Sequence, residues 1–79
     1  GESIQADAHQ ALEIERVRKA IKKLSPLHQD VIIMRFVEEL TIREVASALK
    51  KSEGAIKLLQ HRAIAELQRI IAENEIETQ

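Results

Sequence analysis

Apolar residues recur at steps of three and four along most of this chain, and that spacing is typical of amphipathic α-helices. The clearest stripe lies in the C-terminal third and comprises Ile56, Leu59, Ala63, Leu67 and Ile70. A second stripe lies near the N-terminus and comprises Ile14, Val17, Ile21 and Leu24. Because the chain has only two glycines and one proline, the pattern predicts an all-α fold of four helices.

A strong break signal separates the first two helices. We expect the first helix over residues 8–24, with Asp7 as its N-cap, after a flexible segment at residues 1–7. Ser25 is then the N-cap and Pro26 the first residue of a second helix that runs to residue 37 or 38. Its core, VIIMRFV, also fits a buried strand, but no partner strand is predicted elsewhere, so a helix is favoured.

The third and fourth helices each begin at a recognisable cap. Thr41 and Glu44 form a T-x-x-E capping box, and the helix that they open ends at Lys50-Lys51. Ser52 caps a longer helix over residues 53–73, and residues 74–79 form a frayed acidic tail. Two helices joined by a tight turn indicate a helix-turn-helix at about residues 42–71, inside a domain at residues 8–73.

The last helix has two unlike sides. At about 100° per residue, its inner side holds Ile56, Gln60, Ala63, Leu67, Ile70 and Ile71. Its outer side holds Gly54, Lys57, Leu58, His61, Arg62, Ala65 and Arg69. There Leu58 suits a thymine methyl, Arg62 suits guanine O6 and N7, and His61 suits a base edge. Lys57 suits a phosphate, and Gly54 allows DNA to approach the helix N-terminus closely. This side is therefore predicted to contact nucleic acid.

The net charge of −1 hides two unlike regions. Residues 16–62 hold eleven Lys and Arg against five Asp and Glu, whereas the rest of the chain holds one against eight. A basic centre with acidic ends suits phosphate contact by one surface. Because the chain as a whole is not basic, we expect the isolated domain to bind DNA weakly.

The sequence indicates no other chemistry. It has no cysteine, and its three histidines fall on different predicted helices, so we expect neither a metal site nor a cofactor. No nucleophile setting or glycine-rich phosphate loop is evident, so we expect no catalytic residues and no enzyme activity. Without a membrane-length apolar run or a signal-peptide pattern, we expect a cytoplasmic protein with no membrane insertion. The predicted contact with nucleic acid makes it a nucleoid-associated one.

Over residues 24–71, several short motifs together resemble region 4 of bacterial sigma-70 family factors, particularly the extracytoplasmic-function type. The first runs from Leu24 to Met34-Arg35, and the second is Glu44-Val45-Ala46. The third is Ser52-Glu53-Gly54-Ala55-Ile56-Lys57, with Arg62-Ala63 after it. Since these motifs follow the family's order and spacing, the resemblance implies a winged-helix-like arrangement of four helices without the wing.

The resemblance also implies a function. Such domains bind the promoter −35 element and the flap of the RNA polymerase β subunit, and so direct transcription initiation. An anti-sigma factor is a further partner that the resemblance suggests. By position, Lys57 and Arg35 would hold backbone phosphates, with Arg43 as a further phosphate contact. The residues that would face −35 bases are Leu58, His61 and Arg62.

Three positions depart from the family pattern. Lys50 stands where the turn usually has glycine, so either it takes a left-handed conformation at roughly 1 kcal/mol or the turn differs. Leu58-Leu59 replaces a frequent Ser-Arg, which leaves the exact −35 sequence open. Gln29 replaces a common arginine in the second helix.

Two alternative functions remain open at the level of sequence. The first is the DNA-binding domain of a response regulator, which would dimerise through Leu67, Ile70 and Ile71. The second is a protein-interaction module that keeps the helix-turn-helix shape without DNA binding. The wide apolar surface of the second helix is either enclosed by the other helices or forms a docking groove for the polymerase flap or an anti-sigma factor. It comprises Val31, Ile32, Ile33, Met34 and Phe36.

Overall fold

The computed structural model describes the backbone of residues 2–78 and the side chains of residues 12–74. Its elements are α1 (Glu2–Lys22), α2 (Pro26–Ile32), the π-helix η1 (Ile33–Val37), α3 (Ile42–Leu49) and α4 (Glu53–Thr78). Residues 2–78 contain no strand, so the predicted all-α fold is confirmed.

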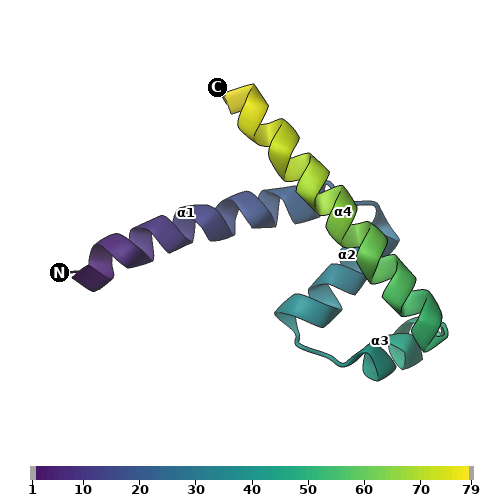
Figure 1. Ribbon diagram of the computed structural model, residues 1–79. Coiled ribbons are helices and arrows are strands. Elements are labelled where there is room, and N and C mark those ends of the chain that lie inside the picture. Colours follow the sequence, from purple (N-terminus) through teal and green to yellow (C-terminus); the bar gives the residue numbers. More distant parts are fainter. Residues whose placement is uncertain (1, 79) are drawn as a thin grey trace.

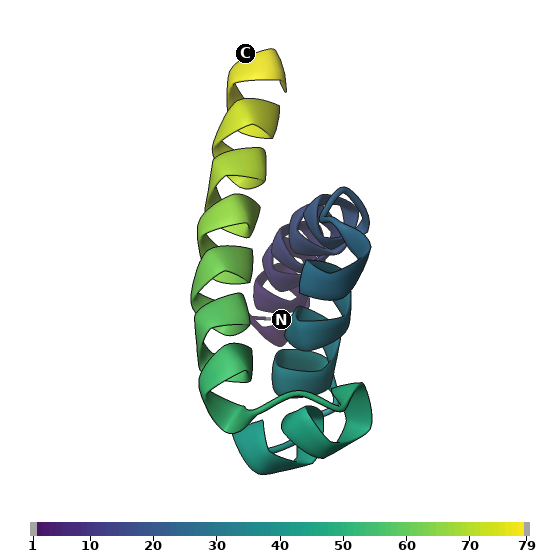
Figure 2. The same cartoon turned by 90° about the vertical axis from the view of Figure 1, so that its right-hand side faces the viewer.

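The long helix α4 runs along one side of the molecule, and α2, η1 and α3 lie beside its N-terminal half (Figures 1 and 2). α1 meets α2 and α4 at its C-terminal end and projects from there away from α3 (Figure 1). The molecule measures 45 × 30 × 15 Å along its principal axes. Among the described side chains of α1, those of residues 12–19 are all exposed.

Two apolar clusters hold the helices together. The first joins α1, α2 and α4 through Ala20, Leu24, Ile32, Ala63 and Ile70. The second joins α3 to α4 through Val45, Ala46 and Ile56, with Met34 and Leu40 packed against it. Because Val45 and Ile56 are fully buried, the second cluster fixes the crossing of the helix-turn-helix.

The segment VIIMRFV is helical, as predicted, but its last five residues, Ile33–Val37, wind as a π-helix. Glu38 N–H donates to Ile33 O at 2.9 Å, and Leu40 N–H donates to Met34 O at 2.9 Å. Glu39 between them has φ of 58°, a left-handed conformation that L side chains seldom adopt. The sequence did not predict this ending, since no glycine or proline marks it.

The predicted caps of α3 and α4 are confirmed. Glu44 N–H donates to Thr41 Oγ1 at 3.0 Å, and Thr41 N–H donates to Glu44 Oε1 at 2.8 Å, which completes the capping box. Ala55 N–H donates to Ser52 Oγ at 3.1 Å. The backbone hydrogen bond from Thr41 lowers the pKa of the Glu44 carboxyl, since it favours the charged form.

The N-terminus of α2 is capped by a different helix. Ser25 occupies the N-cap as predicted, but its side chain makes no capping hydrogen bond. Instead, Glu66 Oε1 on α4 accepts from Ser25 N–H at 3.2 Å and from His28 Nδ1 at 3.1 Å. Glu66 therefore takes the place of the carboxylate in a capping box and ties α4 to the start of α2.

This tie predicts how stability depends on pH. The hydrogen bonds from the His28 side chain and from Ser25 N–H lower the pKa of the Glu66 carboxyl below its ordinary 4.5. Their contribution to folding is present above that ordinary value and is lost as pH falls through the lowered pKa. We expect Glu66→Gln to lose less stability than the wild type between about pH 5 and about pH 3 in urea titrations. Parallel curves for the two proteins would contradict this assignment.

The ends of the terminal helices differ from the prediction. α1 begins at Glu2, so Asp7 lies inside the helix rather than at its N-cap, and α4 continues to Thr78. In both places a run of residues without glycine or proline extends the helix past the expected end. The division into a flexible segment at residues 1–7, a domain at 8–73 and a frayed tail at 74–79 stays a prediction.

Only the C-terminal half of the first stripe enters the core. Leu24 is buried and Ile21 half-buried, whereas Ile14 is 58% exposed and Val17 is 38% exposed. The reason is geometric, since α1 meets the other helices only near its C-terminal end.

The turn between α3 and α4 uses a left-handed lysine. Lys50 has φ of 57° and ψ of 46°, which decides between the two alternatives for this position. Lys51 N–H donates to Ala46 O at 2.9 Å and Lys50 N–H donates to Ser47 O at 3.3 Å. These two bonds form a Schellman motif, which usually has glycine at the left-handed position.

We therefore expect Lys50→Gly to raise the free energy of unfolding by about 1 kcal/mol, because glycine takes this conformation without steric cost. Urea denaturation measures the change. Lys51→Gly is the matched control, since Lys51 has no positive φ and glycine there only adds freedom to the unfolded chain. Equal effects of the two substitutions would contradict a role for backbone strain at Lys50.

Candidate nucleic-acid interface

The described part of α4, up to residue 74, packs against the other helices from one side only. Its predicted inner residues are all buried or half-buried, and they comprise Ile56, Gln60, Ala63, Leu67, Ile70 and Ile71. Leu59 is half-buried and packs against the cluster of Val45 and Ile56. Of the Leu58-Leu59 pair, therefore, only Leu58 is a surface residue.

The opposite side of α4 is exposed, as predicted. The exposed residues are Gly54, Lys57, Leu58, His61, Arg62, Ala65 and Arg69. Leu58 is 48% exposed, which is a large apolar surface for a lone residue between basic neighbours. Within the described residues, the side chains of Lys57, His61 and Arg62 make no hydrogen bond or ion pair, so their polar groups are available to a ligand.

Further basic residues lie next to this surface. Arg43 is exposed in the first turn of α3, and Lys50 and Lys51 are exposed in the turn before α4. Gly54 lies in the first turn of α4, and a Cβ atom there would meet no heavy atom within 4 Å. Packing inside the domain therefore does not require this glycine. We name the set of Arg43, Lys57, Leu58, His61 and Arg62 the basic face.

Arg35, the remaining predicted phosphate contact, does not belong to the basic face. It is half-buried, its Nε donates to Gln60 Oε1 at 2.8 Å, and its Nη1 donates to Leu40 O. Its guanidinium also lies 5.8 Å from the ring centre of Phe36. Two of its nitrogens are thus already used inside the domain.

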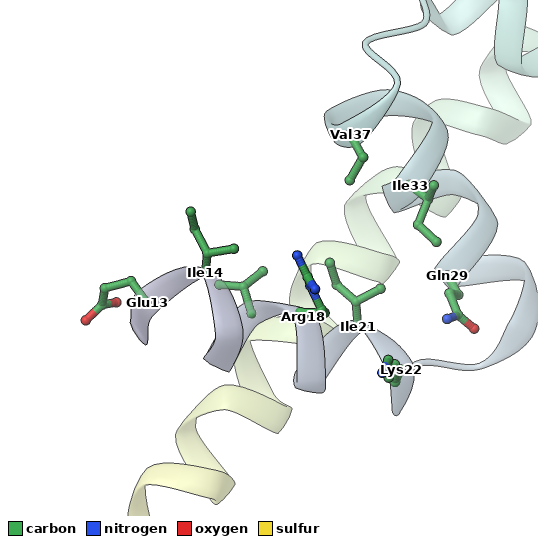
Figure 3. Close-up of a pocket in the computed structure, with 9 residues that line it drawn as sticks. Glu13, Ile14, Arg18, Ile21, Lys22, Gln29, Ile33 and Val37 are labelled. Atoms are coloured by element: carbon green, nitrogen blue, oxygen red, sulfur yellow. The ribbon is translucent and has the colours of Figure 1, made fainter. Parts of the chain in front are cut away.

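A groove lies on the other side of the molecule, between α1 and the helical segment α2–η1 (Figure 3). It has a volume of about 580 Å³. Ile14 and Ile21 rise from α1 toward Ile33 and Val37 of η1, and Val17 completes the apolar lining. The polar residues that also line it are Glu13, Arg18, Lys22 and Gln29.

The groove divides the apolar surface predicted for the second helix. Val31 and Ile32 are buried, and Met34 packs against the cluster at α3, so these residues are enclosed. Ile33 faces the groove, and Phe36 is 52% exposed. The contributions of Ile14, Val17 and Val37 were not predicted. The apolar stripe of α1 could have pointed to Ile14 and Val17, but the sequence does not say which residues of the stripe pack in the core and which line a groove.

The described residues contain no group of three side chains suited to holding a metal ion. No described helix is long and apolar enough to cross a membrane.

Comparison with known proteins identifies the family. The Sigma-70, region 4 family matches residues 20–69. The chain belongs to this family. Region 4 is a transcription-factor domain. The match begins at Ala20, which is the first buried residue among the described side chains of α1, so the projecting half of that helix lies outside it.

Relatives of this region 4 domain come from sigma factors of Streptomyces. The ECF RNA polymerase sigma factor BldN of Streptomyces coelicolor is 38% identical over 55 residues, which are 70% of this chain and 21% of that protein. The RNA polymerase sigma-E factor of Streptomyces antibioticus is 40% identical over 48 residues, 61% of this chain and 27% of that protein. The chain thus spans about a quarter of the length of these relatives.

A solved structure of an RsbN–BldN complex contains a similar fold. Its TM-score is 0.70 at 35% identity, over 87% of this chain and 47% of that chain. Membership of region 4 rules out the response-regulator alternative. The structure agrees, since Ile70 is buried in the core cluster with Ala20 and Leu24, and Leu67 and Ile71 pack against that cluster.

Proposed function

We propose that this region 4 domain recognises the promoter −35 element and docks on RNA polymerase as part of an alternative, extracytoplasmic-function type sigma factor. The observation that carries the proposal is the basic face, where three polar side chains without partners and one exposed leucine share the outer side of a helix fixed from behind. The proposed place of action is the cytoplasm, at the nucleoid.

In this proposal α4 lies in the major groove. Leu58, His61 and Arg62 read base edges, because they project from one side of the helix. Lys57 and Arg43 hold phosphates of the DNA backbone. Gly54, which has no neighbouring atom where a Cβ would lie, lets the DNA backbone approach the N-terminus of α4.

Salt-dependent binding to duplex DNA tests the proposal. A −35 duplex selected from a random pool and a scrambled duplex are titrated at several salt concentrations, and binding is followed by fluorescence anisotropy. We expect a slope of log K against log salt of roughly −2 or steeper, because at least two phosphate contacts are proposed. No preference between the duplexes together with a flat slope would favour the protein-interaction module.

The groove between α1 and η1 is the proposed docking site for the flap of the polymerase β subunit. Its apolar lining by Ile14, Val17, Ile21, Ile33 and Val37 suits an amphipathic helix of a partner. We also propose an anti-sigma factor as a second protein partner of this domain. Support for it is a similar chain that was solved as an RsbN–BldN complex.

We predict that a purified flap fragment shifts the NMR signals of Ile14, Val17, Ile33 and Val37 and leaves those of Lys57 and Arg62 unchanged. Val37→Ser should weaken binding by about 1 kcal/mol, roughly fivefold, because Val37 is 66% exposed and would be covered by the partner. Leu58→Ser is the matched control, since it also alters an exposed aliphatic residue but lies on the basic face. Shifts centred on α4 would contradict the proposed docking site.

A further inference from the structure

Arg35 joins three segments of the domain that are separate in sequence. It lies in η1, its Nε donates to Gln60 on α4, and its Nη1 donates to the carbonyl oxygen of Leu40. Leu40 directly precedes Thr41, which is the N-cap of α3. One guanidinium therefore fixes the start of α3 and the N-terminal half of α4 against η1.

The acceptor on α4 lies next to the proposed base contacts. Gln60 is half-buried on the inner side of α4, and the next two residues are His61 and Arg62 on the outer side. A small rotation or shift of α4 at Gln60 would displace both side chains from the base edges that they read. We infer that Arg35 is a positioning residue, which acts through Gln60 to hold the basic face in register with DNA.

This inference rests on the proposed function, and it replaces the phosphate contact that the family resemblance suggested for Arg35. The two roles make different demands on the side chain. A phosphate contact needs a positive charge, which lysine also supplies. The observed tie needs two donors diverging from one planar group, and lysine cannot reproduce that geometry.

The first test concerns the tie alone and uses no DNA. In the ¹⁵N-labelled chain, the Arg35 Nε–H signal should be resolved and should move in Gln60→Leu, which removes the acceptor. The backbone signals of Leu40 and His61 should move in the same direction in Arg35→Lys and in Gln60→Leu. An Arg35 signal that Gln60→Leu leaves unchanged would overturn the inference.

The second test measures the ratio of affinities for the selected and the scrambled duplex. We expect Arg35→Lys and Gln60→Leu each to reduce this ratio about five- to tenfold, because a misplaced base contact costs discrimination. Gln60→Glu is the conservative variant, since it keeps an acceptor oxygen at the same chain length. It should retain the ratio while its added negative charge weakens binding to both duplexes alike.

A phosphate contact at Arg35, or a purely structural role, would give a different result. Loss of a phosphate contact, or partial unfolding of the domain, weakens both duplexes equally and leaves the ratio unchanged. Arg16→Lys is the matched control for an arginine-to-lysine change, because the Arg16 side chain is 65% exposed on α1, outside the helix-turn-helix. A wild-type ratio in Arg35→Lys would overturn the positioning role. If the wild-type protein bound the selected and the scrambled duplex equally, the proposed function would be overturned and the positioning role with it. The NMR test would then report only on the hydrogen bonds of Arg35.

Discussion

Replacing Ile56 with alanine is expected to lower the free energy of unfolding by about 3 kcal/mol, within the 2–5 kcal/mol typical of such truncations in cores. Ile56 is fully buried between α3 and α4, where it packs with Val45 and Ala46. Truncation removes apolar contacts and leaves a cavity that two crossing helices cannot close. A domain of this size has a total stability of roughly 4–12 kcal/mol, so the loss is a large share of it.

Leu58→Ala is the matched control for this prediction. Leu58 lies two residues further along the same helix but is 48% exposed on the basic face. Its truncation should change stability by about 0.5 kcal/mol or less. Urea denaturation followed by circular dichroism measures both variants. Equal losses at the two positions would mean that the sides of α4 are assigned wrongly.

Arg62→Ala is expected to have the largest effect on DNA binding. If Arg62 contacts a guanine through two hydrogen bonds, its removal costs about 1–3 kcal/mol, or roughly 5- to 150-fold, against the selected duplex. Binding to the scrambled duplex should change much less, so the preference itself should fall. Competition titrations with duplexes altered one base pair at a time would locate the position at which selectivity is lost.

Two comparisons make the Arg62 prediction specific. Lys57→Ala should weaken all duplexes about equally and reduce the salt slope by about 1, because a phosphate contact carries no sequence information. Arg69→Ala should leave the preference unchanged, since Arg69 lies further along α4 and its Nη1 pairs with Glu73 at 2.9 Å. If Arg69→Ala and Arg62→Ala relaxed selectivity alike, the base contacts would be assigned wrongly.

The two sides of α4 followed directly from the sequence. Burial of Ile56 and exposure of Arg62 agree with a count of 100° per residue, because a helix repeats the same geometry at every step. The caps at Thr41 and Ser52 were also predicted, because a capping side chain bonds to a backbone group within three residues of itself.

The sequence was ambiguous where one residue type permits two backbones. Lys50 fits an ordinary turn or a left-handed Schellman ending, and only the packing of α3 against α4 selects the second. Glu39 also has a left-handed backbone conformation, and nothing in the sequence indicated it. At Asp7 the prediction from the sequence was clear but wrong. Asp7 is a good N-cap residue, but the helix continues through it because residues that favour helix lie on both sides.

By itself, the sequence determined the four helical segments, the caps of α3 and α4, the outer residues of α4 and the resemblance to region 4. Only the tertiary structure decided which helices meet. It assigned Glu66 to the N-terminus of α2, tied Arg35 to Gln60 and left Ile14 and Val17 beside a groove rather than in the core. The physical reason is the separation along the chain between the residues that interact. Helix periodicity and capping join residues three or four positions apart, whereas these contacts join residues that become neighbours only when the chain is folded.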